Sequence, residues 1–134
     1  IYGCALLNQT IARMLDDEEP TEALEESVDF CRRRAKKTPE TKELFEATEK
    51  VESLEKSVLS NSGYVVDTLQ SSFYYSFTSE SFEEAVIEAV NGGGDTDTVG
   101  AVTGALAGAR FGKSEVPDRW QCLVKDEVEA GLIF

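Results

Sequence analysis

The sequence predicts an all-α protein. Along most of the chain apolar residues recur at intervals of three and four, the pattern of helices that bury one face. Proline, threonine and serine stand where these segments begin, and glycine stands where others end. No convincing stretch alternates apolar and polar residues as a half-buried strand does. The expected architecture is a compact orthogonal bundle of several helices, formed by residues 1–134 as a single segment.

Two helices are expected before residue 38. The first covers residues 1–15, and an acidic run with Pro20 separates it from the second. The predicted buried stripe of the second helix is Ala23, Leu24, Val28 and Cys31. This helix ends in the basic residues Arg32, Arg33, Arg34, Lys36 and Lys37, whose charge complements the helix dipole. The run could also bind a phosphate or a nucleic acid, but in so acidic a chain a solvated, compensating role is favoured.

A third helix is predicted from Thr38 and Pro39 to about residue 59, followed by a loop over residues 60–63. The next helix covers residues 65–77. Its predicted inner positions are Val66, Leu69, Phe73 and Phe77, with Tyr74 and Tyr75 flanking them. Asp67 lies in the first turn, where the dipole stabilises a carboxylate, and is given a structural role.

Ser81 and Glu84 form a predicted capping box at the start of a helix that leads into a triple glycine. The helix after Thr98 has glycines at 100, 104 and 108, and their cost in helix propensity suggests a close contact with another helix. We therefore expect a central, nearly encircled helix that ends at Gly112 in a left-handed cap. A last helix should turn Trp120 and Leu123 inward, and the tail offers Val128, Leu132 and Ile133 to a core.

Oxygen-bearing side chains follow the triple glycine directly. Gly92, Gly93 and Gly94 permit a sharp turn, and Asp95, Asp97 and Thr98 come next, at the start of the helix. Such hard oxygen ligands favour Mg²⁺, Mn²⁺ or Ca²⁺ over zinc or copper. On local chemistry alone, however, the simpler interpretation is that the two carboxylates cap the helix.

Composition restricts the function. The chain has 26 acidic and 13 basic residues, a net charge of −13, which argues against nucleic acid or an anionic membrane as a partner. It has no histidine, so Ser-His-Asp and Cys-His catalysis are excluded. Three scattered cysteines indicate neither a zinc ribbon nor a disulfide framework, and a cytoplasmic location is the simplest expectation. No secretory leader is predicted, and the longest apolar run, residues 99–109, is too short to span a bilayer.

The segment Gly93-Gly94-Asp95-Thr96-Asp97-Thr98, with the Gly/Ala-rich helix after it, resembles the C-terminal signature of the ADP-ribosylglycohydrolase family. Upstream, Ser62-Gly63-Tyr64 followed by a helix is similar to a second element of that family. Further on, Val116-Pro117 and Trp120 resemble its Ile-Pro-x-x-Trp step. These matches lie in the family's order and cover residues 60–121.

The resemblance implies hydrolysis of the glycosidic bond that links ADP-ribose to a modified side chain, with two Mg²⁺ or Mn²⁺ ions as cofactors. It assigns Asp95 and Asp97 as catalytic, and Asp95, Asp97 and Thr98 as metal ligands. The residues it places against the substrate are Ser62, Gly63, Tyr64, Gly93 and Gly94. The implied partners are ADP-ribose or an ADP-ribosylated protein.

The family's Thr-Asp-Asp run, which supplies other metal ligands, has no counterpart in this chain. The chain therefore resembles the C-terminal half of the family domain, and the N-terminal half is a further implied partner. Two alternatives stay open: a non-catalytic, crystallin-like relative, and a module that binds ADP-ribose without cleaving it.

Overall fold

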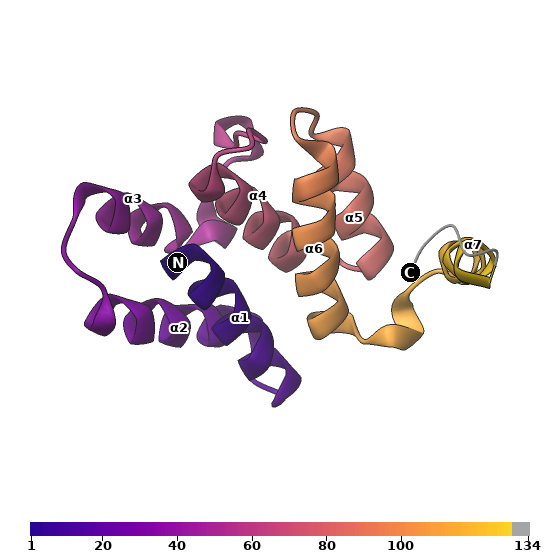
Figure 1. Cartoon of the computed structure of the whole chain (residues 1–134), viewed down its shortest axis with the longest axis horizontal. Coiled ribbons are helices and arrows are strands. Elements are labelled where there is room, and N and C mark those ends of the chain that lie inside the picture. Colours follow the sequence, from indigo (N-terminus) through magenta and orange to yellow (C-terminus); the bar gives the residue numbers. More distant parts are fainter. Residues whose placement is uncertain (130–134) are drawn as a thin grey trace.

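The computed structural model describes residues 1–129, with side chains described to residue 125. Within this range the chain forms seven α-helices, three short 3-10 helices and no strand, which confirms the all-α prediction. The α-helices are α1 (Tyr2–Leu15), α2 (Pro20–Arg34), α3 (Pro39–Thr48), α4 (Val65–Thr78), α5 (Phe82–Asn91), α6 (Thr96–Phe111) and α7 (Asp118–Glu129). Helices α5 and α6 lie side by side and α4 packs against both, while α7 stands at one end of the molecule (Figure 1).

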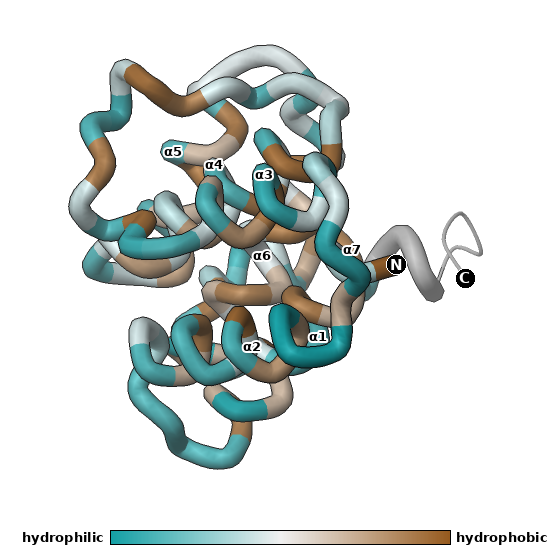
Figure 2. Tube along the Cα trace, turned by 90° about the vertical axis from the view of Figure 1, so that its left-hand side faces the viewer, coloured by the Kyte–Doolittle hydropathy of each residue, from teal (hydrophilic) through white to brown (hydrophobic). Residues whose placement is uncertain are grey.

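The main core is formed by the apolar faces of α1, α2, α3, α4 and α6. Hydrophobic and hydrophilic stretches alternate along these helices (Figure 2), as expected for elements with one buried face. All four stripe residues predicted for α2 are buried, and so are the four inner positions predicted for α4. Leu6 and Leu106 join them, which ties α1 and α6 to the same core.

The helix starts follow the capping signals of the sequence. Thr38 and Thr41 form a reciprocal capping box at α3. At α5, the Ser81 hydroxyl accepts a hydrogen bond from the Glu84 N–H at 3.1 Å, as predicted. The Glu84 carboxylate, however, accepts from the Glu80 N–H at 2.7 Å, so the capping box is shifted by one residue at that contact.

The third helix is shorter than predicted. It ends at Thr48, and Lys50 adopts a left-handed conformation with φ 54°. Two 3-10 helices, η1 (Val51–Ser53) and η2 (Lys56–Val58), replace the expected helical continuation. The apolar spacing misled the prediction because Val51, now in η1, is still fully buried.

Helix α6 packs its glycines against α5, as the sequence suggested. A methyl group at Gly100 would lie 3.2 Å from Val90 Cγ2, and methyl groups at Gly104 and Gly108 would lie 3.9 Å from Val86 and Phe82. The helix is not encircled, however. Ala101 and Ala105 are exposed, because α1, α4 and α5 cover the other sides of α6 and leave this one open.

An arginine joins α6 to the end of α4. Arg110 Nη1 donates hydrogen bonds to the carbonyls of Ser76, Phe77 and Ser79, at 2.7, 3.2 and 2.9 Å. These carbonyls belong to the last turn and C-cap of α4, which have no partner within the helix. Gly112 ends α6 with φ 85° and ψ 166°, so its positive φ is as predicted but its ψ lies outside the left-handed helical region.

Helix α7 follows the 3-10 helix η3 (Lys113–Glu115) and is held mainly by one aromatic side chain. Trp120 packs inward against Phe82 with ring centroids 6.1 Å apart, as predicted. Leu123 does not: it is 64% exposed, because α7 projects from the bundle (Figure 1) and contacts α5 through Trp120 and Arg119. The tail positions Val128, Leu132 and Ile133 lie outside the described side chains. Among the described helices, none has the length and apolar character needed to cross a bilayer.

Candidate metal and substrate site

The triple-glycine turn has two residues with positive φ. Helix α5 ends at Asn91, Gly93 and Gly94 both adopt φ +73°, and Asp95 is the N-cap of α6. At Gly94 a second constraint applies, since a Cβ there would lie 2.0 Å from the Asn61 carbonyl oxygen. At Gly93 a Cβ would meet nothing within 4 Å. Conformation alone therefore requires glycine at 93, whereas conformation and close packing together require it at 94.

The loop before α4 is fastened to this turn by Asn61. Its carbonyl accepts a hydrogen bond from the Asp95 N–H at 2.7 Å, and its Nδ2 donates to the Ala89 carbonyl at 3.3 Å. No sequence pattern indicated a role for this residue, because an asparagine in a Ser-Asn-Ser-Gly loop is an ordinary turn residue. The two segments that the resemblance paired are thus in direct contact.

The same loop is hydrogen-bonded to the first turn of α4. Ser62 Oγ donates to Asp67 at 2.6 Å and accepts from the Tyr64 N–H at 3.1 Å. Thr68 Oγ1 donates to the Ser62 carbonyl at 3.2 Å. Asp67 therefore fixes the loop conformation, which is the structural role expected for it.

Asp95 does not cap α6 with its side chain. Its carboxylate lies instead beside Gly63, where an added Cβ would come within 2.9 Å of Oδ2. A hydrogen bond with the Asp95 side chain, followed by bonds from the backbone N–H groups of Thr98 and Asp97, holds the pKa of Asp97 below its usual value. Asp95 is partly exposed, and Asp97 and Thr98 are exposed, so all three side chains are accessible at the N-terminus of α6.

Tyr64 borders the same region but is not packed into the core. Its side chain is 45% exposed, and its hydroxyl donates a hydrogen bond to Glu43 of α3 at 3.0 Å. This hydrogen bond raises the pKa of Tyr64. The residue therefore lies between α3 and the start of α4 and is partly exposed to solvent.

The side chains at the turn suit a hard divalent cation in kind but not in number. Two carboxylates and a hydroxyl are the oxygen donors that Mg²⁺ and Mn²⁺ accept. A cation placed beside these two neighbouring carboxyl groups would be attracted to both. Among the described residues, no three His, Cys, Asp or Glu side chains are grouped as a metal site. The remaining ligands of any bound ion must come from water or from groups outside this segment.

Two cavities are found elsewhere in the described region. One lies between the end of α2 and α3, and the other is lined by residues of α2 and the segment from Thr48 to Glu52. Neither borders the glycine turn. The candidate site residues therefore line neither of these two cavities.

Comparison with known proteins identifies the family of the chain. Residues 1–132 match the family model described as ADP-ribosylglycohydrolase. An ADP-ribosyl-[dinitrogen reductase] glycohydrolase of Rhodospirillum rubrum is 42% identical over 69 residues, which cover 52% of this chain and 24% of that protein. The ADP-ribosylarginine hydrolase Tri1 of Serratia proteamaculans is 42% identical over 60 residues, 45% of this chain and 16% of the relative.

A third relative, the ADP-ribosylhydrolase ARH3 of Homo sapiens, is 44% identical over 41 residues, 31% of this chain and 11% of the relative. The matches lie in the C-terminal portions of these longer proteins, and the aligned part is about a quarter of their length or less. No solved structure matches the chain significantly. The extended match to the family model shows that the chain belongs to the ADP-ribosylglycohydrolase family.

Proposed function

We propose that this chain supplies the C-terminal part of the active site of a metal-dependent hydrolase, which cleaves the glycosidic bond between ADP-ribose and a modified side chain. The observation that supports this most directly is the position of Asp95. Its carboxylate makes no capping bond, lies within hydrogen-bonding reach of Asp97 and faces the Gly63 loop. The relatives from Rhodospirillum rubrum and Serratia proteamaculans are named as hydrolases of this class.

Asp95, Asp97 and Thr98 would hold the divalent cation, with Asp97 as the principal ligand. A bound divalent ion would orient the ribose hydroxyls and activate or position water for attack at the anomeric carbon. The N-terminus of α6 adds a partial positive charge, which favours a carboxylate at Asp97 in its first turn.

The substrate would lie across the two fastened segments. Gly93 has open space beside its Cα, so a bulky ligand can approach the backbone closely there, and the backbones of Gly63 and Gly94 would line the site beside it. The backbone of Ser62 would line the site from the loop, and the exposed part of the Tyr64 ring would contact the ADP-ribose. Because the chain supplies only two carboxylates, we propose that full activity requires the rest of the family domain.

Calorimetric titration of the chain with Mn²⁺ tests the metal site. We expect weak binding, because water must complete the coordination, and a loss of about tenfold or more in affinity in Asp97→Ala, as removal of a charged ligand implies. Asp118→Ala is the matched control, since Asp118 is also an exposed aspartate in the first turn of a helix. Equal Mn²⁺ affinities in the two variants would contradict the assignment.

Titration with ADP-ribose separates the alternatives. Binding that strengthens with Mn²⁺ supports the hydrolase site. Binding that ignores the metal favours a module that holds ADP-ribose, and no binding with or without metal favours a structural relative. In a longer protein that contains this segment, Asp97→Ala should abolish release of ADP-ribose from an ADP-ribosylated arginine peptide, whereas Asp118→Ala should leave it unchanged.

A further inference from the structure

A second region that resembles a ligand site lies far along the chain from the glycine turn. It is a cavity of about 720 Å³ between the C-terminal end of α2 and helix α3, here called the basic cavity. Ala35, Pro39 and Phe45 form its apolar lining, and Phe45 is only 4% exposed. A concave, mainly apolar site of this volume with a few charged groups at its edge is typical of small-molecule sites.

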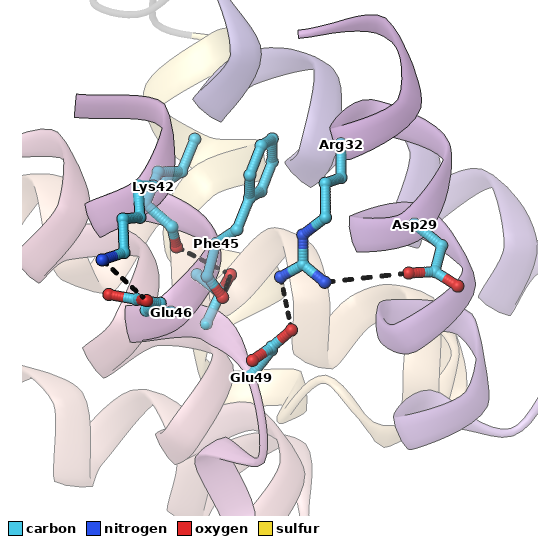
Figure 3. Close-up of polar contacts among 8 residues, drawn as sticks. Asp29, Arg32, Lys42, Phe45, Glu46 and Glu49 are labelled. Atoms are coloured by element: carbon cyan, nitrogen blue, oxygen red, sulfur yellow. Dashed lines mark hydrogen bonds and ion pairs between the residues drawn. The ribbon is translucent and has the colours of Figure 1, made fainter. Parts of the chain in front are cut away.

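Cations dominate the charged lining. Arg32, Lys36, Lys37 and Lys42 border the cavity, against only two carboxylates. Both carboxylates are already paired: Glu49 with Arg32, and Glu46 with Lys42 at 3.7 Å. Figure 3 shows the Arg32 guanidinium between Asp29 and Glu49, beside the Phe45 ring, whose centroid is 5.5 Å from Arg32 Cζ.

Lys36 and Lys37 are left without an ionic partner among the described residues. They follow the last turn of α2, in the extended segment that begins at Ala35. The helix-dipole argument that accounts for Arg32 to Arg34 weakens beyond the last turn and explains these lysines poorly.

The lysines of the cavity are not needed to stabilise the start of α3 either. The Thr38 and Thr41 capping box satisfies the start of that helix. Glu40 adds a carboxylate to the first turn, and bonds from the Thr38 hydroxyl and its own N–H hold the pKa of Glu40 below its usual value. No backbone group of α3 therefore requires Lys36 or Lys37.

We propose that the basic cavity binds a small organic anion with a flat ring and a phosphate group, of which a nucleoside phosphate is the simplest example. The apolar lining accepts the ring, which can also stack on the planar Arg32 guanidinium. Lys36 and Lys37 supply ammonium donors for the phosphate. The proposal is independent of the function assigned to the glycine turn, because the two regions share no residue.

The chain's own acidity does not exclude an anionic ligand. At physiological ionic strength the Debye length is about 8 Å, so exposed carboxylates on other faces are largely screened. The local charge of the lining is what the ligand meets. Binding of this kind should weaken as salt concentration rises.

The experiment is a titration of the isotope-labelled chain with AMP, followed by the NMR shifts of its backbone amides. We expect the largest shifts between Arg32 and Phe45. The double variant Lys36→Ala/Lys37→Ala should lose affinity for AMP by about tenfold or more, because it lacks the charge-assisted hydrogen bonds to the phosphate. The matched control is Arg33→Ala/Lys113→Ala, which removes the same charge from two exposed positions outside the cavity lining and should bind AMP as the wild type does.

Three results would overturn the proposal. The first is an absence of AMP-dependent shifts around the cavity, and the second is equal weakening in the two double variants. The third is equally strong binding of inorganic phosphate, which would mean that the ring makes no contact. Shifts confined to residues 92–98 would support the glycine-turn site and count against the basic cavity, so the two assignments can fail separately.

Discussion

At the scale of single residues, the three glycines around the candidate site meet different physical demands. Gly93 provides only a positive φ, and Gly94 provides the same φ together with space for the Asn61 carbonyl. Gly63 provides space for the Asp95 carboxylate. The sequence alone could indicate a turn here, but it could not separate these roles, because each depends on which segment lies opposite.

Replacing Gly94 with alanine should therefore destabilise the protein more than replacing Gly93. A left-handed conformation costs an alanine about 1–2 kcal/mol, and both variants incur that cost. Only Gly94→Ala adds a clash with backbone, at 2.0 Å, that no side-chain rotation relieves. Urea unfolding of both variants measures the difference, and equal midpoints would mean that Asn61 does not press against the turn.

The three cysteines should differ sharply in reactivity. Cys4 and Cys122 are exposed, whereas Cys31 is 2% exposed in the main core. Burial raises the pKa of the Cys31 thiol, with Arg34 opposing this weakly. A thiol reagent should modify Cys4 and Cys122 in the native protein and reach Cys31 only on unfolding. Rapid modification of all three would contradict the described core.

The same raised pKa makes stability depend on pH. Above a pH of about 8.5 the thiol ionises in the unfolded chain while it stays protonated in the folded one. Stability should therefore fall as pH rises through this range. Cys31→Ala should be less stable throughout but should lose less stability on going to high pH, as urea midpoints would show.

At the scale of elements, helix boundaries were predictable where a capping side chain marks them. Pro20, Thr38 and Ser81 each stand at or next to the observed first residue of a helix. The end of α3 was not predictable, because Lys50 takes a positive φ without being glycine or asparagine. The pairing of the Ser60–Tyr64 loop with the glycine turn was predicted from family resemblance alone. The Asn61 contact that joins them could not be predicted from the sequence, because a contact between two loops produces no repeating pattern of residues.

Some glycines on the side of α6 that faces α5 are not required for the two helices to pack. At Gly104 an added Cβ would meet Val86 at 3.9 Å, an ordinary contact. Gly104→Ala should stabilise the chain by roughly 0.5–1 kcal/mol through helix propensity. Gly100→Ala should gain less, since its Cβ would lie 3.2 Å from Val90. Thermal unfolding measures both, and a loss of stability in Gly104→Ala would mean that the helices approach more closely than described.

At the scale of the whole molecule, charge and core act against each other. The main core joins five of the described helices, whereas the surface carries twice as many acidic as basic residues. Ion pairs such as Lys42 with Glu46 are exposed, and pairs of this kind contribute about 0–1 kcal/mol each. Repulsion among the surface carboxylates should therefore outweigh the attraction between carboxylates and the lysine and arginine side chains that pair with them.

Salt should consequently stabilise the protein. Raising NaCl from about 10 mM to about 150 mM shortens the Debye length from about 30 Å to about 8 Å, which screens the repulsion. We expect the thermal midpoint to rise. A variant with less negative charge, Glu25→Gln/Glu80→Gln, should show a smaller rise, because both positions are exposed carboxylates. A midpoint that falls with salt would indicate that the ion pairs dominate.

The bond between Asn61 and Asp95 has a consequence for how the two segments change over evolutionary time. A larger residue at position 94 would displace the loop, and the displaced Asn61 carbonyl would no longer accept the hydrogen bond from the Asp95 N–H. A larger residue at position 63 moves the carboxylate itself. A single substitution at either place therefore disturbs the contact between the two segments, and a change in one segment calls for a matching change in the other.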